Sequence, residues 1–96
     1  AHPAAMNARV ELARTELVAG RAAAARATLE PTVDAIARRT DLPPMLVVES
    51  GLVLAEIELA QGRRAQARRR AAAAFAASTP ATAPMVEAWR RAHPGL

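Results

Sequence analysis

The chain has 96 residues, a mass of 10.1 kDa and a formal net charge of +4, from 13 basic and 9 acidic residues. It contains no Cys, which excludes disulfide scaffolds, iron–sulfur clusters and thiolate zinc sites. No run of about 18 apolar residues occurs, so a membrane-spanning helix and a membrane partner are not expected. The first residues show no basic segment leading into an apolar one, so no secretory signal is visible and a cytoplasmic protein is expected.

Helical periodicity extends along the chain, and no alternating run of β-branched residues predicts a strand. A first helix is expected over about 5–19, because four apolar residues recur on one face of the helical period. Gly20 follows at the C′ position, where helices commonly end. The four apolar residues are Met6, Val10, Ala13 and Leu17.

A second helix is expected over about 21–39, with an ion pair between Asp34 and Arg38 one turn apart. Pro31 lies inside this segment and removes one backbone donor, so we expect a kink or a short break there. The following segment, 40–44, contains two consecutive Pro residues and is predicted to be a loop.

The third predicted helix, about 44–61, is apolar almost all round and is therefore expected to have neighbours on both sides. Gly62 ends it, and a fourth helix over about 63–77 follows. A connector with two Pro residues leads to a short last helix over about 84–93 that carries Met85, Val86 and Trp89. The core must be thin, because 27 of the apolar residues are Ala and only 23 are larger.

An internal repeat is the most informative feature of the sequence. Residues 12–21 align with residues 54–63, and both copies lead through a Gly into an Ala-rich helix. The repeat period is the spacing from Gly20 to Gly62. Tandem helical hairpins of this kind indicate an α-solenoid. The predicted fold is therefore all-α, one domain over 1–96, with hairpin one at about 5–39, hairpin two at about 44–77 and a C-terminal capping helix.

The repeat resembles the tetratricopeptide repeat. Small residues let the two helices of such a hairpin approach closely. Gly51 and Glu58 stand where that family has its usual Trp and Tyr, and the period exceeds the family's typical length of about 34 residues. The matching small positions are Ala13, Gly20 and Ala25 in the first copy and Ala55, Gly62 and Ala67 in the second.

Residues 9–77 are also similar to the helical-repeat region of bacterial LuxR-type, MalT-like transcriptional regulators. The strings that carry this narrower resemblance are Leu29-Glu30-Pro31, Val47-Val48-Glu49 and Leu54-Ala55. In those regulators the repeats lie between a nucleotide-binding ATPase module and a C-terminal helix-turn-helix. The resemblance implies that this chain is a piece of a longer protein and carries a sensor or oligomerisation function in transcription regulation. An independent scaffold or oligomerisation domain unrelated to transcription is the alternative.

The resemblance also implies a binding surface, since the first helices of tetratricopeptide hairpins line a concave groove. Glu49 and Glu56 are seven residues apart and share a helix face, so Arg14 is expected to meet them across the boundary between the hairpins. A protein or peptide partner, or a small effector, is the expected ligand. Carried over, the groove residues are Asn7, Val10, Arg14, Leu17, Glu49, Leu52, Glu56 and Leu59.

No enzymatic constellation is visible, and we expect no cofactor and no metal site. The two His residues lie at opposite ends, and neither Ser50 nor Ser78 has a His and an Asp nearby in sequence. The densest Arg cluster, in 63–70, points in nearly all directions around a helix and lacks aromatic residues. Direct DNA binding by this segment is therefore not expected, and a basic nucleic-acid-binding helical domain is the least favoured of the alternatives. Self-association into a symmetric dimer is expected, centred on Val10, Leu17, Val18 or Trp89.

Overall fold

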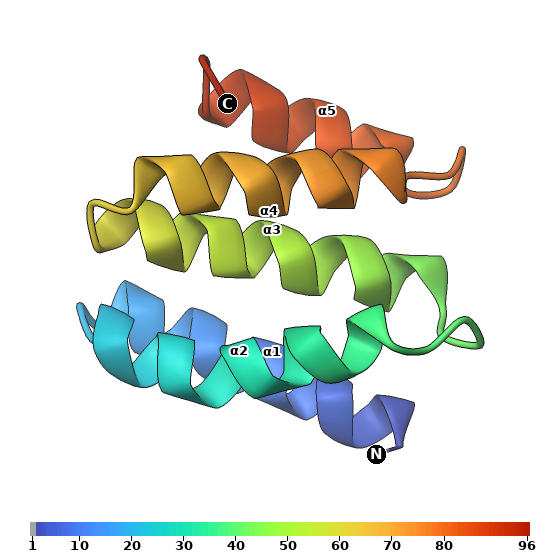
Figure 1. The fold of residues 1–96 in the computed structure, drawn as a ribbon, viewed down its shortest axis with the longest axis horizontal. Coiled ribbons are helices and arrows are strands. Elements are labelled where there is room, and N and C mark those ends of the chain that lie inside the picture. Colours follow the sequence, from blue (N-terminus) through green and yellow to red (C-terminus); the bar gives the residue numbers. More distant parts are fainter. Residues whose placement is uncertain (1) are drawn as a thin grey trace.

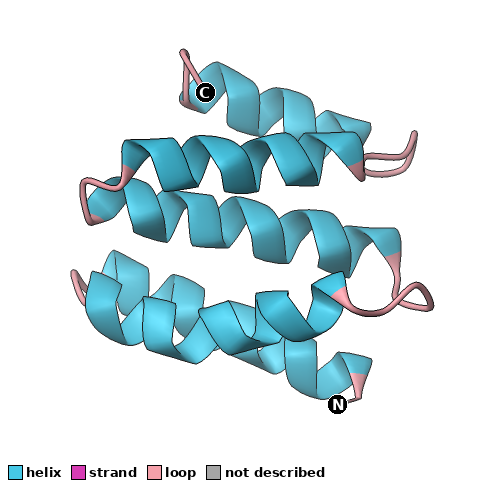
Figure 2. Cartoon of the chain, in the orientation of Figure 1, coloured by secondary structure: helices cyan, strands magenta, loops and turns pink. Residues whose placement is uncertain are grey.

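The computed structural model describes residues 2–96, and this part of the chain folds entirely into helices and the turns that join them (Figures 1 and 2). The prediction of an all-α protein is confirmed. Each boundary lies within about two residues of the predicted one, which is the usual precision of helix ends. The helices are α1 (Pro3–Val18), α2 (Ala22–Ala37), α3 (Pro44–Ala60), α4 (Arg64–Ala76) and α5 (Ala83–Ala92).

A kink or a short break was predicted at Pro31; helix α2 continues through this residue, so the break is wrong. A proline costs its helix the hydrogen bond to the carbonyl four residues earlier, which here belongs to Ala27. Both Pro31 and Ala27 are exposed, so water can satisfy that carbonyl. Helix α1 begins two residues earlier than predicted because the Nδ1 atom of His2 caps it, accepting a hydrogen bond from the amide of Ala4 at 3.0 Å.

The turns after α1 and α3 have the same geometry. Gly20 and Gly62 adopt φ angles of 80° and 73°, a left-handed conformation that favours glycine. The amide of Arg21 donates to the carbonyl of Glu16 at 2.8 Å, and the amide of Arg63 donates to that of Glu58 at 2.8 Å. Each glycine amide donates in turn to the carbonyl three residues before it, at 3.0 Å. This pair of bonds is the Schellman motif, and it starts α2 and α4 exactly one repeat period apart.

Helix α3 is the centre of the molecule, as its all-round apolar sequence predicted. It lies against α1, α2 and α4 (Figure 1), and ten of its 17 residues are buried. Close approach to α4 is possible because residue 51 is Gly, where an added Cβ atom would lie 3.2 Å from the Cβ of Ala74. Alanine and glycine contacts of this kind supply little burial per residue but allow tight helix packing.

Two hydrophobic cores lie on either side of the α3 axis. The first core joins α1 and α2 to α3 and consists of Met6, Val10, Ala13, Ala25, Leu29, Ile36, Leu46, Val53, Leu54 and Ile57. The second core joins α3 and α4 to α5 and consists of Val48, Leu52, Ala55, Ala67, Ala71, Ala74, Val86 and Trp89.

The two cores repeat each other at the spacing of Gly20 and Gly62. Five members of the first core have their counterpart in the second: Met6 and Val48, Val10 and Leu52, Ala13 and Ala55, Ala25 and Ala67, Leu29 and Ala71. Helix α3 closes the first core, and α5 closes the second. Ala71 is much smaller than Leu29, and the second core has in Trp89 a larger side chain than any in the first.

Candidate functional site

The groove residues predicted from the resemblance fall into two groups. Val10 and Leu52 are 0% and 3% exposed and belong to the first and second cores, so the prediction that they line an accessible surface is wrong. The physical reason is the repeat itself, because the two residues are counterparts and each is covered by the helix that closes its core. Asn7 and Arg14 are exposed, and the side chains of Leu17, Glu49, Glu56 and Leu59 are half-buried.

Arg14 and Glu49 meet as predicted. The Nη2 atom of Arg14 donates to Oε2 of Glu49 at 2.8 Å and links α1 to α3. The side chains are 44% and 26% exposed, so water and salt screen the pair and its contribution to stability is about 0–1 kcal/mol. Glu56 lies farther along the same face of α3, with Oε1 3.8 Å from Nε2 of His93. His93, the C-cap residue of α5, therefore contacts one end of the predicted groove.

The predicted centres of self-association are also partly buried. Val10 and Trp89 are core residues, so they cannot centre a dimer contact. Val18 is 85% exposed, and Leu12 is 52% exposed on the same helix. Six positions separate them, which places their side chains about 120° apart on α1. They are single apolar residues on the surface and do not form a patch.

A pocket of about 390 Å³ lies between α2, α3 and α4, on the side of α3 away from the predicted groove. Its lining residue on α3 is Glu58, nine positions from Glu49 and hence about 180° around the helix. Four residues of α4 at one helical face complete the lining, together with Arg26 of α2. These four are Gln66, Arg69, Arg70 and Ala73.

The pocket contains buried polar atoms that accept no hydrogen bond within the described chain. They are both carboxylate oxygens of Glu58 and Oε1 of Gln66. Glu58 is 0% exposed, although buried carboxylates almost always have partners. Guanidinium nitrogens of Arg70 and Arg26 lie 3.5 and 3.8 Å from Oε2 of Glu58, beyond the usual range of about 2.7–3.2 Å for an N–H···O hydrogen bond.

The guanidinium groups of Arg26 and Arg70 differ in the lengths of the contacts that they make. Arg26 donates to Glu30 at 2.8 Å and to Oε1 of Gln61 at 3.2 Å. Arg70 makes only long contacts, 3.5 Å to Glu30 and 3.9 Å to Asp34. The expected ion pair between Asp34 and Arg38 does not form within residues 2–96; Asp34 lies 3.9 Å from Arg70 of α4 instead, and Arg38 is the C-cap residue of α2.

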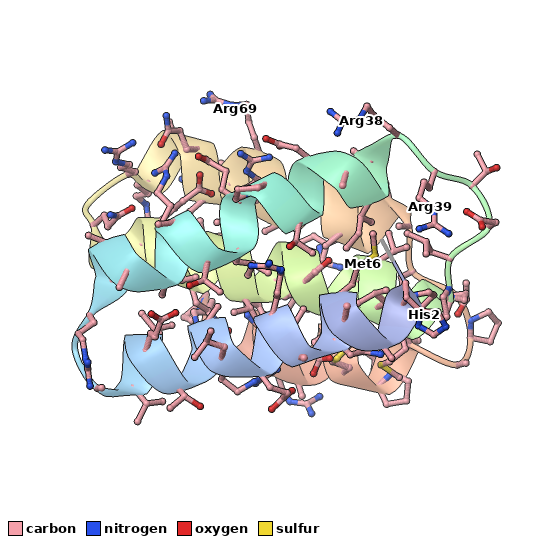
Figure 3. The ribbon with its side chains drawn as sticks, turned by 90° about the horizontal axis from the view of Figure 1, so that it is seen from below. His2, Met6, Arg38, Arg39 and Arg69 are labelled. Atoms are coloured by element: carbon pink, nitrogen blue, oxygen red, sulfur yellow. The ribbon has the colours of Figure 1, made fainter. Side chains whose placement is uncertain are left out.

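Arg69 stands at the rim of the pocket and points away from the ribbon (Figure 3). Within residues 2–96 it has neither an ion pair nor a hydrogen bond. Its neighbour Arg68 donates to the carbonyl of Gly95 at 3.4 Å, on another side of α4. The Arg cluster therefore splits in direction, as its spacing predicted, and does not form one basic stripe.

Sequence reasoning did not identify this pocket. In the sequence, Glu58 stands out only as a departure from the tetratricopeptide pattern. In the structure, the carboxylates of Glu56 and Glu58 point to different surfaces of α3. The signal that could have found the site is a charged residue within a helix that is otherwise apolar on nearly every face. The partners from α2 could not be found without the tertiary structure, since Arg26 and Glu58 are far apart in the sequence and lie in different hairpins.

The comparisons with known proteins assign no family to this chain. Family models, curated proteins and solved structures were compared with the chain, and none of them matches it. Across residues 2–96, His, Asp and Glu side chains form no group of three that could hold a metal ion. Over the same range, no helix has the length and apolar character needed to cross a membrane.

Proposed function

We propose that the chain is a tetratricopeptide-like helical-repeat module without catalytic activity, which binds a protein or peptide partner through the exposed part of the α1 and α3 face. The observation that carries this proposal is the repetition of the core. Five core positions recur at the repeat period, and both repeats end their first helix with the same glycine turn. Recurrence of contacts along the chain is the defining property of solenoids.

The position of α5 supports a stack of two hairpins that is closed at its C-terminal end. Helix α5 contributes Val86 and Trp89 to the second core and closes it, as α3 closes the first core. The opposite side of α5 carries Glu87 and Arg91, both exposed. A terminal element with one apolar and one polar face is what a solenoid needs at its end.

The outer face of α1 supports a closed N-terminal end. The α3 residues that pack on the preceding hairpin include Leu46, Val53 and Ile57. Their counterparts one repeat period earlier are Ala4, Glu11 and Thr15, all exposed. An additional hairpin packed against α1 would bury a carboxylate there, which is costly without a partner.

The binding surface that remains comprises Asn7, Arg14, Leu17, Glu49, Glu56 and Leu59. It offers both signs of charge beside half-buried leucines, and interfaces commonly combine apolar contacts with polar groups at the rim. An exposed ion pair such as Arg14–Glu49 can exchange its partners with a peptide at little cost.

Selection of peptides tests this proposal. A displayed library of random peptides is panned against the chain, and enriched peptides are measured again with the variant Arg14→Ala/Glu49→Ala. The matched control is Asp34→Ala/Arg38→Ala, which removes one charge of each sign from a different surface. Binding that the first variant abolishes and the control retains supports the proposal. Failure to enrich any peptide, or equal loss in both variants, contradicts it.

The same proposal places the module in the sensor region of a bacterial LuxR-type regulator, on the resemblance of residues 9–77. Reading the coding sequence on both sides of the chain tests this part. A nucleotide-binding ATPase module before it and a helix-turn-helix after it support the regulator. Their absence favours the alternative, an independent scaffold or oligomerisation domain.

A further inference from the structure

We propose that the pocket between α2, α3 and α4 binds a free α-amino acid with an apolar side chain. This site is separate from the peptide surface on α1 and α3, because Glu58 and Glu49 point in opposite directions from α3. Its volume of about 390 Å³ falls near the lower end of small-molecule pockets, which hold about 300–1,000 Å³. The chemistry of its lining identifies the class of ligand.

Three acceptors of the pocket accept no hydrogen bond within the described residues: the two carboxylate oxygens of Glu58 and Oε1 of Gln66. The guanidinium groups of Arg70 and Arg26 approach Oε2 of Glu58 only to 3.5 and 3.8 Å. Leaving such atoms unpaired in a buried place costs free energy. An ammonium group carries three N–H donors and one positive charge. It therefore matches the three acceptors in number and the carboxylate of Glu58 in charge.

The guanidinium groups at the other side of the pocket favour a ligand that carries an anionic group. Arg69 has no partner within the described residues, and Arg70 makes only contacts of 3.5 Å or longer. Guanidinium groups bind carboxylates through paired, charge-assisted hydrogen bonds. The lining residues Arg26, Arg69, Arg70 and Glu58 have a formal net charge of +2, but Glu30 and Asp34 contact Arg26 and Arg70 and bring the sum for the whole cluster to zero. A ligand without net charge therefore suits the site better than a cation or an anion. A zwitterion meets both requirements.

The space for a side chain lies beyond Arg70 and Ala73. These two residues also line a second, smaller pocket of about 150 Å³, which continues between α2 and α4 over α3. The remaining lining of that pocket is mostly apolar and includes Val33, Val47 and Ala74. An aliphatic side chain directed there removes apolar surface from water.

Calorimetric titration of the full 96-residue chain tests the proposal, with L-leucine, L-valine and L-methionine as probes. At least one of them should bind with a Kd tighter than about 1 mM. Leucinamide lacks the carboxylate and 4-methylpentanoate lacks the ammonium, and each should bind at least about tenfold more weakly than L-leucine. Binding by neither amino acid nor analogue, which is the result expected if water alone fills the pocket, overturns the proposal.

Variants assign the binding to this pocket. Glu58→Gln and Arg69→Gln should each weaken amino-acid binding by at least about tenfold, since each removes a charged partner. Arg69 is on the surface, so its variant remains folded even where Glu58→Gln does not. Arg91→Gln on α5 removes the same charge outside the pocket and should retain full affinity. Unchanged affinity in Arg69→Gln, or equal affinity for L-leucine and leucinamide, contradicts the proposal.

Discussion

Glu16 and Glu58 occupy the same position in the two repeats, yet only Glu16 accepts a hydrogen bond on its side chain. The hydroxyl of Thr28 donates to Oε1 of Glu16 at 2.7 Å. The counterpart of Thr28 in the second repeat is Arg70, whose Nε atom lies 3.5 Å from Oε2 of Glu58. The first repeat thus has a hydrogen bond from a neutral hydroxyl to the carboxylate, where the second repeat has an ion-pair contact that is both longer and more deeply buried.

The contact between Arg70 and Glu58 predicts that substitutions at these two residues have coupled effects on the free energy of unfolding. Arg70→Gln leaves the buried Glu58 with only the 3.8 Å contact to Arg26, so the free energy of unfolding should fall by about 2 kcal/mol, less than the usual 3–5 kcal/mol for a broken buried pair. The loss is smaller because Arg70 is about one-third exposed. The double variant Arg70→Gln/Glu58→Gln should recover most of it, as measured by urea denaturation.

The control for this cycle is Arg69→Gln, which removes an Arg that makes no ion pair within residues 2–96 from the same helix. Its free energy of unfolding should stay within about 0.5 kcal/mol of the parent value. Additive losses in the double variant would show that Glu58 and Arg70 do not interact energetically.

The sequence predicted the helices and the repeat because both depend on local spacing. Apolar periodicity defines the buried faces, and a glycine is needed wherever the chain turns with positive φ. The inward direction of Val10 and Leu52 was missed, because carrying residues over from a family assumes that its groove positions are exposed. The pocket at Glu58 was missed for another reason. Its groups come from three helices, and only tertiary packing decides which charges meet.

Close packing at small core residues predicts that a larger side chain lowers the free energy of unfolding more at a buried alanine than at an exposed one. Ala55→Leu and Ala67→Leu should each lower the free energy of unfolding by about 1–3 kcal/mol, because both alanines are 0% exposed in the second core. Ala73→Leu is the matched control, since Ala73 is exposed on α4 and its added carbons meet solvent and the pocket rim. Thermal unfolding measures all three. Equal midpoints would refute the packing of α3 against α4 described above.

The glycine turns predict that a Gly→Ala substitution lowers the free energy of unfolding equally in the two repeats. Gly20→Ala and Gly62→Ala should each destabilise by about 1–2 kcal/mol, the cost of a left-handed conformation with a Cβ atom. Beyond the adjacent residues, a Cβ atom added at either position would meet nothing within 4 Å, so the cost is one of backbone conformation alone. Chemical denaturation of both variants checks this. Costs that differ severalfold would show that the turns are not equivalent.

The loop between α2 and α3 predicts a small acid-dependent effect. Arg39 donates to both carboxylate oxygens of Asp41, at 2.9 and 2.8 Å, and these hydrogen bonds lower the pKa of Asp41 below its usual value. The stabilisation is therefore present above the pKa of the unfolded chain, about 3.9, and is lost as the pH falls through the lower pKa of the folded chain. Asp41→Asn should lower the thermal midpoint at pH 7 and have no effect in strong acid. A pH-independent difference would contradict this assignment.

Helix α5 is part of the second core through Val86 and Trp89. Trp89 is 8% exposed, forms an edge contact with Phe75 at a centroid distance of 5.9 Å, and stacks on His93 at 4.0 Å. Trp89→Ala should lower the free energy of unfolding by about 3–5 kcal/mol, because the alanines of α4 cannot fill the space that the indole leaves. Glu87→Ala on the exposed side of the same helix should change it by about 0.5 kcal/mol or less.

Circular dichroism during urea denaturation distinguishes a core helix from an appendage. If α5 closes the second core, Trp89→Ala shifts a single transition for the whole chain to lower urea, since α3 contributes to both cores and couples them. If α5 is an appendage, the variant loses only the signal of one short helix, and the main transition stays where it was. The second result would remove the observation that closes the stack at its C-terminal end.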